Sequence, residues 1–457
     1  MAWSKKHGDI LQTFFQELDK ENIRFFIIRN FEGLPANNPS KDVDIILKHG
    51  TAFAAEKILI KVFKQFNLTH YYRVQIEESL LCRAIDINNE FAIHIDLMNG
   101  YINRGVELFS FEELYNQTID YNGFKVLNKL YDGIMLFVYK QFGYKRPVLK
   151  QSYQDTIYKT WEKYPEFSSI LNNLLGSDLF NTISQCIKNK DFDKMLTYSP
   201  DVNKKLRTYS NKQHRIINYY RKFKFIGQKV NRILLNYRKY EKSISVMAPD
   251  GAGKTTFLMS LLEMLAFYYV DATKDISRFH IYHFRPTLLP NLGEIGEKAK
   301  VKKQDIDFTN PHRAKPAGFF SSIIRITYYW LDYVLGWMLY TRKDVQYDFY
   351  TVYDRYSYDL IVDPGRTRLN IPMWIRKLYV SCMPHPKLNF FLNADPNIII
   401  KRKAELTLPE IERQIQAFQE LCKNNSNIII LNANLTTPEI VNEAIKHVIN
   451  KYWTKLA

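Results

Sequence analysis

The chain has 457 residues, of which 46% are hydrophobic and 24% charged, which is the composition of a soluble globular protein with two or three domains. Its formal net charge of +17 favours anionic partners: nucleotides, phosphosugars, nucleic acid or an acidic membrane surface. The four cysteines form no CxxC pair, which argues against a disulfide framework or a structural zinc site. No signal peptide is evident. We therefore expect a cytoplasmic protein, and leave peripheral association with the inner face of a membrane open.

Residues 1–200 have the pattern of an α/β domain with a helical extension. Four apolar runs predict strands, and TAFAAEKILIKVFKQF predicts a helix between the second and third of them. From Tyr131 to about Leu196 the spacing of apolar residues is helical, with breaks near Pro147 and Pro165. The four predicted strands are RFFIIRN, DVDIIL, LLCRAIDI and EFAIHIDLM.

Two of these strands carry a candidate metal site. Asp42 and Asp44 alternate along one strand and so share a face. Asp96, on another strand, would complete a cluster of three carboxylates. Such clusters bind two Mg²⁺ ions that clamp the attacking and leaving oxygens in nucleotidyl transfer.

Residues 8–150 resemble the nucleotidyltransferase fold in this DxD pair and third acid. They differ from it where Arg29-Asn30 replaces the usual Gly-Ser turn, which binds the triphosphate. Three interpretations stay open: an active nucleotidyltransferase, a degenerate domain used for substrate binding, and an unrelated α/β domain.

Residues 201–242 are predicted to form a basic linker between two domains. From 203 to 242 the sequence has 13 Lys or Arg residues and one acid, Glu241, with Tyr and Phe among the charges. This segment is a candidate contact for an acidic membrane surface or for nucleic acid. The alternative is a helical linker with a solvated basic face.

The segment APDGAGKTT, residues 248–256, is the strongest signal in the chain. It matches the phosphate-binding pattern GxxxxGK[ST], except that Ala248 takes the position of the first glycine. An apolar strand precedes it and an amphipathic helix follows. The glycines let backbone N–H groups turn toward phosphate, Lys254 would reach the β- and γ-phosphates, and Thr255 would ligand Mg²⁺. The predicted cofactors are ATP and Mg²⁺, and the predicted ATP-binding residues here are Asp250, Gly251, Ala252, Gly253, Lys254, Thr255 and Thr256.

With Asp250 in the loop, this segment resembles that of thymidylate kinases, and the resemblance continues through residues 243–457. Asp354, Arg355 and Tyr356 are similar to the DRY segment of that family, and NIIILNANLTTPEIVNEAI to its last strand and adenine-side loop. LNFFLNADPNIIIKRKAEL is similar to the segment leading into its lid, where Lys401, Arg402 and Lys403 would close over ATP. The resemblance implies an α/β P-loop domain with a parallel sheet covered by helices. It also implies that Asp354 supports Mg²⁺ or orients the acceptor, and that Arg355 binds an anionic acceptor.

The REPGGT-like segment of thymidylate kinases is replaced here by HFRPTLLPNLGEIG, in which Arg285 would keep the phosphate-clamping role. Arg366 and Arg368 add cations on the acceptor side. RPTLLPNLG and DRYSYDLIVDPGR resemble the thymidylate-kinase-like proteins found with bacterial surface-polysaccharide genes. Thymidylate is therefore not the expected acceptor.

The apolar window Phe319–Tyr340 contains Arg325 and Asp332, so we expect a helix buried in a soluble domain rather than a membrane span. The predicted function is Mg·ATP-dependent phosphorylation of a small acceptor that offers a hydroxyl or an anionic group: a sugar, polyol, phosphosugar or nucleoside monophosphate. Nucleotidyl transfer by residues 1–200 would make the enzyme bifunctional, and an oligomer is left open. The alternatives are a thymidylate kinase proper, a nucleic-acid end-processing enzyme and a non-catalytic ATP-binding scaffold.

Overall fold

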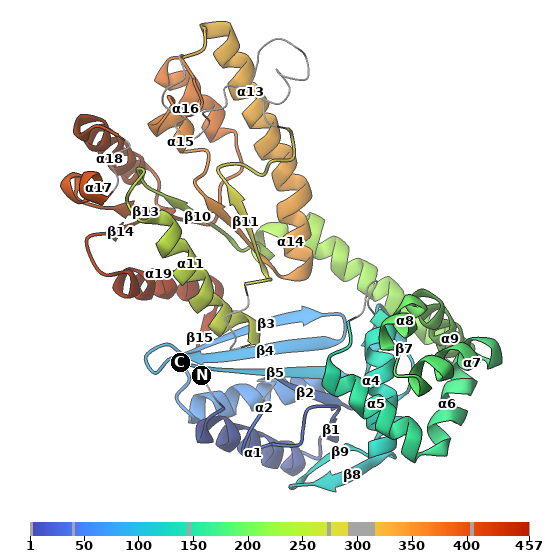
Figure 1. Ribbon diagram of the computed structural model, residues 1–457. Coiled ribbons are helices and arrows are strands. Elements are labelled where there is room, and N and C mark those ends of the chain that lie inside the picture. Colours follow the sequence, from blue (N-terminus) through green and yellow to red (C-terminus); the bar gives the residue numbers. More distant parts are fainter. Residues whose placement is uncertain are drawn as a thin grey trace. The chain divides into compact units, whose positions relative to one another are not determined.

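The computed structural model describes residues 3–38, 42–143, 148–271, 276–290, 316–402 and 406–456. The chain divides into two compact units, Met1–Lys229 with Trp453–Ala457, and Val230–Tyr452 (Figure 1). The first is built on a mixed sheet and the second on a parallel sheet covered by helices. This confirms the predicted α/β fold class.

The first unit contains an eight-stranded sheet in the order β15-β3-β4-β5-β2-β1-β9-β8. One face packs against α1 and α2, and the other packs against the helices that follow the sheet in sequence. The strands are β1 Phe25–Ile27, β2 Asp42–Leu47, β3 His70–Ile76, β4 Ser79–Asp86, β5 Phe91–Asn99, β8 Thr118–Tyr121, β9 Phe124–Leu127 and β15 Thr454–Lys455, with β6 Ile102–Asn103 and β7 Val106–Glu107 in a separate ribbon. The helices are α1 Lys5–Lys20, α2 Ala52–Gln65, α3 Phe111–Tyr115, α4 Lys129–Gly143, α5 Gln151–Lys163, α6 Pro165–Leu175, α7 Ser177–Lys188, α8 Phe192–Thr197 and α9 Ser199–Val230.

The segment predicted as a linker, 201–242, is mostly part of the first unit. Residues up to Lys229 cluster with that unit, and the long helix α9, kinked at His214, accounts for most of them. The polar side chains of Ser210 and Asn218 are fully buried in it. Buried polar side chains are not expected in a solvated linker. The boundary between the two units, predicted as the range 201–242, therefore lies at the end of α9.

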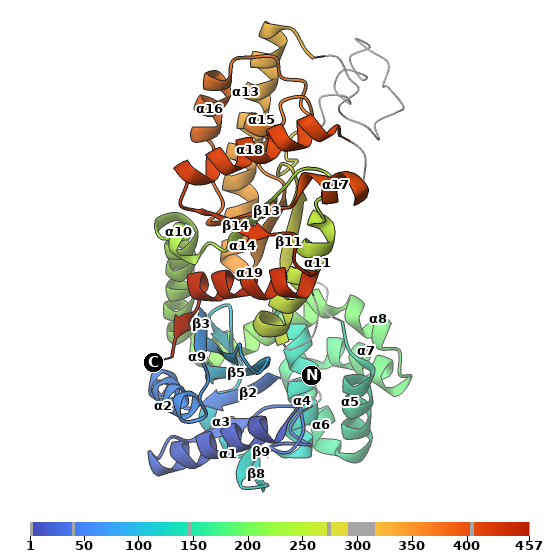
Figure 2. The same cartoon turned by 90° about the vertical axis from the view of Figure 1, so that its left-hand side faces the viewer.

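The second unit contains a five-stranded parallel sheet in the order β11-β12-β10-β13-β14. In Figure 2, α18 and α19 lie in front of this sheet and α13 lies behind it. The strands are β10 Ser243–Met247, β11 Phe279–His283, β12 Tyr350–Asp354, β13 Leu388–Asn393 and β14 Ile428–Asn432. The helices are η1 Asn231–Leu235, α10 Tyr237–Tyr240, α11 Lys254–Ala266, η2 Phe267–Asp271, α13 Phe319–Gly336, η4 Trp337–Thr341, α14 Arg342–Tyr347, α15 Asp359–Val362, α16 Met373–Ser381, α17 Pro396–Arg402, α18 Leu408–Asn424 and α19 Thr437–Tyr452.

The apolar window forms α13 and η4, as a helix was expected there. Only one face is buried, because Ile326 and Tyr333 are inaccessible while Phe320 and Ile324 are exposed. No helix within the described ranges is long and apolar enough to cross a bilayer. Asp332, the acid inside the window, is fully buried and accepts a hydrogen bond from Arg285.

Candidate functional site

The phosphate-binding segment follows β10, the central strand of the parallel sheet. All five strands run in one direction, so their carboxyl ends meet at one edge, where α/β proteins bind ligands. Gly251 (φ 88°) and Gly253 (φ 86°) are both left-handed, a conformation open to glycine without steric cost. α11 then begins at Lys254. The loop therefore delivers free backbone N–H groups and a helix N-terminus to the same point, which together attract anions.

Lys254 is buried, and its Nζ donates to the carbonyl oxygens of Ala248 and Pro249 at 3.0 Å each. Burial, together with the Arg355 guanidinium, lowers the pKa of Lys254 to about 8. Asp250, 3.6 Å away, opposes this shift without cancelling it. The ammonium group is hydrogen-bonded to carbonyl oxygens of its own loop. The charged oxygens of a triphosphate would form stronger hydrogen bonds with it.

Asp250 is held by two arginines from elsewhere in the chain. Its carboxylate accepts hydrogen bonds from Arg355 and from Arg366. Burial raises the pKa of Asp250, but Arg355, Lys254 and Arg366 outweigh it and bring the pKa to about 2. Asp250 thus remains ionised and ties the loop to the segments after β12.

Asp354 and Arg355 lie where β12 ends. Asp354 is bonded to Nδ1 of His283, the last residue of β11, at 3.1 Å. Burial raises the pKa of Asp354, but this bond and the nearby Lys254 and Arg355 leave it below the usual value. Arg355 has a φ of 74°, which a non-glycine residue adopts only at a cost of about 1–3 kcal/mol when its surroundings hold it. Its guanidinium is buried between Asp250 and Asp359, with the Asp359 bond at 2.6 Å.

A divalent cation fits this edge of the sheet on two observations. Oδ1 of Asp354 is buried and has no hydrogen-bond partner among the described residues, so one hard oxygen ligand is unused. Thr255 is exposed in the first turn of α11, two residues after Gly253. Thr255 and Asp354 are the two Mg²⁺ ligands that the sequence predicted in this unit.

The predicted phosphate clamp and lid residues have different surroundings. Arg285 is buried and donates to Asp332 at 2.7 Å and to the carbonyl of Leu289 at 2.9 Å, so it is already used inside the unit. Arg402 lies over the loop: a Cβ placed on Gly253 would be 3.8 Å from its Nη1. Lys401 is exposed, and Lys403 lies outside the described residues.

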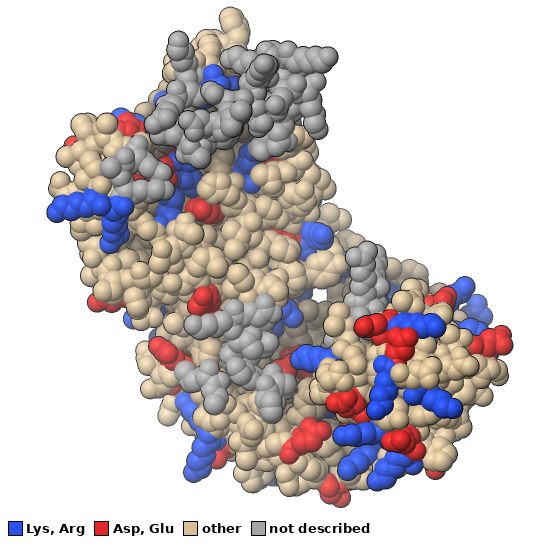
Figure 3. Space-filling model, viewed as in Figure 1, with Lys and Arg blue, Asp and Glu red and all other residues tan. Residues whose placement is uncertain are grey.

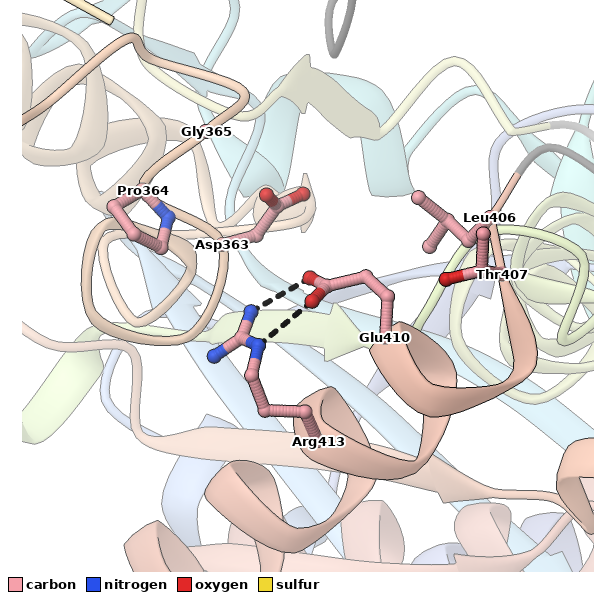
Figure 4. A pocket seen from close by; sticks show the side chains of 7 residues that line it. All are labelled: Asp363, Pro364, Gly365, Leu406, Thr407, Glu410 and Arg413. Atoms are coloured by element: carbon pink, nitrogen blue, oxygen red, sulfur yellow. Dashed lines mark hydrogen bonds and ion pairs between the residues drawn. The ribbon is translucent and has the colours of Figure 1, made fainter.

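A cavity of about 440 Å³ is lined in part by the three residues that precede Arg366 in the sequence. Figure 4 shows its walls: Asp363, Pro364 and Gly365, the residues just before Arg366, face Leu406, Thr407 and the start of α18. Glu410 of that helix is bonded twice by Arg413, at 2.7 and 2.8 Å. The cavity is large enough for a small molecule and carries charged groups of both signs.

In the first unit, Asp44 and Asp96 are neighbours. Parallel pairing of β2 with β5 sets Asp44 beside Asp96 and Asp42 beside His94. Desolvation, and next the Asp44 carboxylate, raise the pKa of Asp96 to about 7.

Arg29 partly neutralises the negative charge of these carboxylates, since its Nε donates to Asp44 Oδ2 at 2.6 Å and both groups are largely buried. Within the described part of the chain, no three His, Cys, Asp or Glu side chains are placed to share a metal ion. This result does not support the Asp42–Asp44–Asp96 metal site, which stays a prediction, as does nucleotidyl transfer.

Comparison with known proteins adds little to this geometry. No protein-family model matches the chain, and no curated protein matches it in sequence. Among solved structures, a thymidylate kinase from Ehrlichia chaffeensis matches with a TM-score of 0.32 and 15% identity, over 45% of this chain and 98% of that one.

Sequence reasoning did not find three residues of this site: His283, Asp359 and Asp363. Asp359 had a local signal, because it lies four residues after Arg355, the spacing that lets an ion pair form along a helical turn. Asp363 binds Arg366 at 3.3 Å from three residues away. His283 had no local sequence signal, since its position beside Asp354 depends on the pairing of β11 with β12.

Proposed function

We propose that the second unit is a Mg·ATP-dependent kinase that phosphorylates a small acceptor. One observation carries the proposal: a loop with two left-handed glycines joins the central parallel strand to α11, and Lys254 and Asp354 face the same edge of the sheet. Phosphoryl transfer requires mainly positioning and neutralisation of charge. This edge supplies both.

Each residue then has a defined part. The N–H groups of 251–256 would hold the phosphates, and Lys254 would move from the carbonyls of Ala248 and Pro249 to the β- and γ-phosphate oxygens. Arg402, beside Gly253, would cover the nucleotide. Thr255 and Asp354 would hold Mg²⁺, which supplies charge neutralisation between the phosphates.

The acceptor would lie near Asp354 and next to the cavity before α18, whose lining includes the residues just before Arg366. Arg285 and Arg355, the cations expected to bind an anionic acceptor, are both paired with buried carboxylates. A neutral sugar or polyol hydroxyl therefore fits the site as well as a phosphorylated acceptor. If Asp354 does not ligand Mg²⁺, it would instead orient that hydroxyl toward the γ-phosphate.

The proposal predicts that ADP forms faster when an acceptor is added. We expect purified full-length protein with Mg·ATP to release ADP slowly alone, and at least tenfold faster with one class among sugars, polyols, phosphosugars and nucleoside monophosphates. Coupled ADP detection with mass spectrometry of the product measures this. Efficient dTDP formation would restore a thymidylate kinase proper. Phosphate on an oligonucleotide end would favour the end-processing enzyme. Nucleotide binding without any acceptor effect would indicate a scaffold.

A second prediction concerns protons. Burial and Arg355 lower the pKa of Lys254 to about 8 in the free protein, so its amine loses its charge as pH rises above that value. The triphosphate favours the charged amine and raises that pKa, so binding must take up a proton and ATP affinity must fall as pH rises from about 8 to 10. Calorimetry in two buffers of different ionisation enthalpy counts the protons. Lys254→Arg, charged throughout this range, should show no uptake. Equal uptake in both proteins would contradict this placement of Lys254.

A further inference from the structure

In the second half of α9, residues 215–229, two polar side chains face the protein. Asn218 is fully buried and Arg221 is nearly so. Both bind Glu107: Arg221 donates to its carboxylate at 2.7 Å, and the Glu107 N–H donates to Asn218 Oδ1 at 3.4 Å. The buried face of this helix is therefore polar, and its polar groups are hydrogen-bonded.

Its outer face is apolar. Ile216 is 88% exposed, Phe223 73% and Tyr220 67%. Their spacing of three and four residues places them on one stripe of the helix, opposite Asn218 and Arg221. We name this set the α9 stripe; it consists of Ile216, Tyr219, Tyr220, Phe223 and Ile226.

Cations border the stripe. Arg215, Lys222 and Lys229 recur every seven residues, so they form one row along its edge. No acidic residue occurs between Asp201 and Glu241. The surface over α5–α8 of the same unit is different, since acidic and basic side chains alternate there (Figure 3). Exposed apolar side chains beside one sign of charge form an interaction surface rather than an ordinary solvated face.

We propose that the α9 stripe docks this protein on the surface of an anionic lipid bilayer. The helix would lie in the plane of the interface, with the stripe among the upper acyl chains and the row of cations at the lipid phosphates. Nucleic acid fits less well, because Ile216, Phe223 and Ile226 occupy the centre that phosphates would need. A second copy fits less well too, because two such helices would bring like charges together.

Vesicle sedimentation of the full-length protein tests this. We expect binding to vesicles of phosphatidylcholine with 30% phosphatidylserine, weaker binding to phosphatidylcholine alone, and loss of the difference at high salt. Ile216→Ser/Phe223→Ser/Ile226→Ser should lower the partition coefficient at least tenfold. The matched control removes three exposed apolar side chains elsewhere in the same unit, Phe53→Ser/Ile119→Ser/Val148→Ser, and should bind as the wild type does.

A second variant separates charge from apolar contact. Arg215→Gln/Lys222→Gln/Lys229→Gln should reduce binding to anionic vesicles and leave binding to neutral vesicles unchanged. The proposal is overturned if the wild type does not sediment with anionic vesicles, or if the α9 and control triple variants bind equally. It is also overturned if the α9 triple variant loses only oligonucleotide binding or only self-association. Kinase activity is a separate readout and tests the other proposal.

Discussion

Lys254→Ala is expected to lower kcat for phosphoryl transfer by at least about 10²–10³-fold, the effect of removing one preorganised group that stabilises transition-state charge. Three described cations are already paired and do not take its place: Arg355 and Arg366 are bound to Asp250, and Arg285 to Asp332. Acceptor-dependent ADP formation measures the loss. Transfer at the wild-type rate by a folded variant would reject the kinase assignment.

The variant should fold normally, because the Lys254 ammonium contributes little to stability. It is held by two loop carbonyls, and burial together with Arg355 lowers its pKa despite the nearby Asp250. We expect a melting temperature within about 3 °C of the wild type, since a ΔΔG below 1 kcal/mol shifts a unit of this size by about that much. Lys423→Ala, an exposed lysine on α18, should change neither rate nor stability. A large fall in melting temperature for Lys254→Ala alone would show a structural role.

The phosphate-binding loop could be predicted from sequence because its determinants are local. An apolar strand, two glycines with positive φ and a helix start lie within fifteen residues, and the structure has β10, the loop and α11 in that order. The parallel sheet followed from strands that alternate with helices, which need long crossover connections. The strand order was not predictable, because it is set by pairings between segments distant in sequence.

The linker was mispredicted and β15 was missed because both depend on contacts between segments distant in sequence. The charge run of 203–242 was predicted to be a linker, with a solvated basic face or an anion-binding surface, since nothing local shows that Glu107, more than 100 residues earlier, accepts a buried bond from Arg221. β15 has only two residues, and it is a strand because it pairs with β3 at the sheet edge. Short segments take their structure from such contacts rather than from propensity.

In the first unit the sequence indicated the proximity of the carboxylates but not how their charge is balanced. Alternation along β2 and β5 was readable, and the structure does set Asp44 beside Asp96. The replacement of the Gly-Ser turn by Arg29-Asn30 was noted only as a departure. In the structure Arg29 binds Asp44, so the substitution that removes a phosphate-binding turn also adds a cation to the cluster.

Glu107→Ala is expected to destabilise the first unit by about 3–5 kcal/mol, because it leaves a buried charge without its partner. Glu107 is 4% exposed and receives bonds from Arg221 at 2.7 Å and His49 at 2.6 Å. After the change, Arg221, 8% exposed, would have to remain charged against an apolar side chain or pull α9 away from β7. Urea unfolding, with hydrogen exchange in 215–229, measures both effects.

A matched control and a pH series show whether this loss comes from the buried pair. Glu78→Ala removes an ion pair to Lys224, which lies on α9 as Arg221 does. This pair is partly exposed, so its loss should cost under about 1 kcal/mol. Burial raises the pKa of Glu107, yet His49 and Arg221 outweigh it and leave the pKa below the usual value. Its contribution is therefore fully present above the unfolded pKa near 4.5 and is lost as pH falls through the lower folded value. The gap between wild type and Glu107→Ala should shrink in acid. A constant gap, or equal costs for the two variants, would mean that other contacts hold α9 in place.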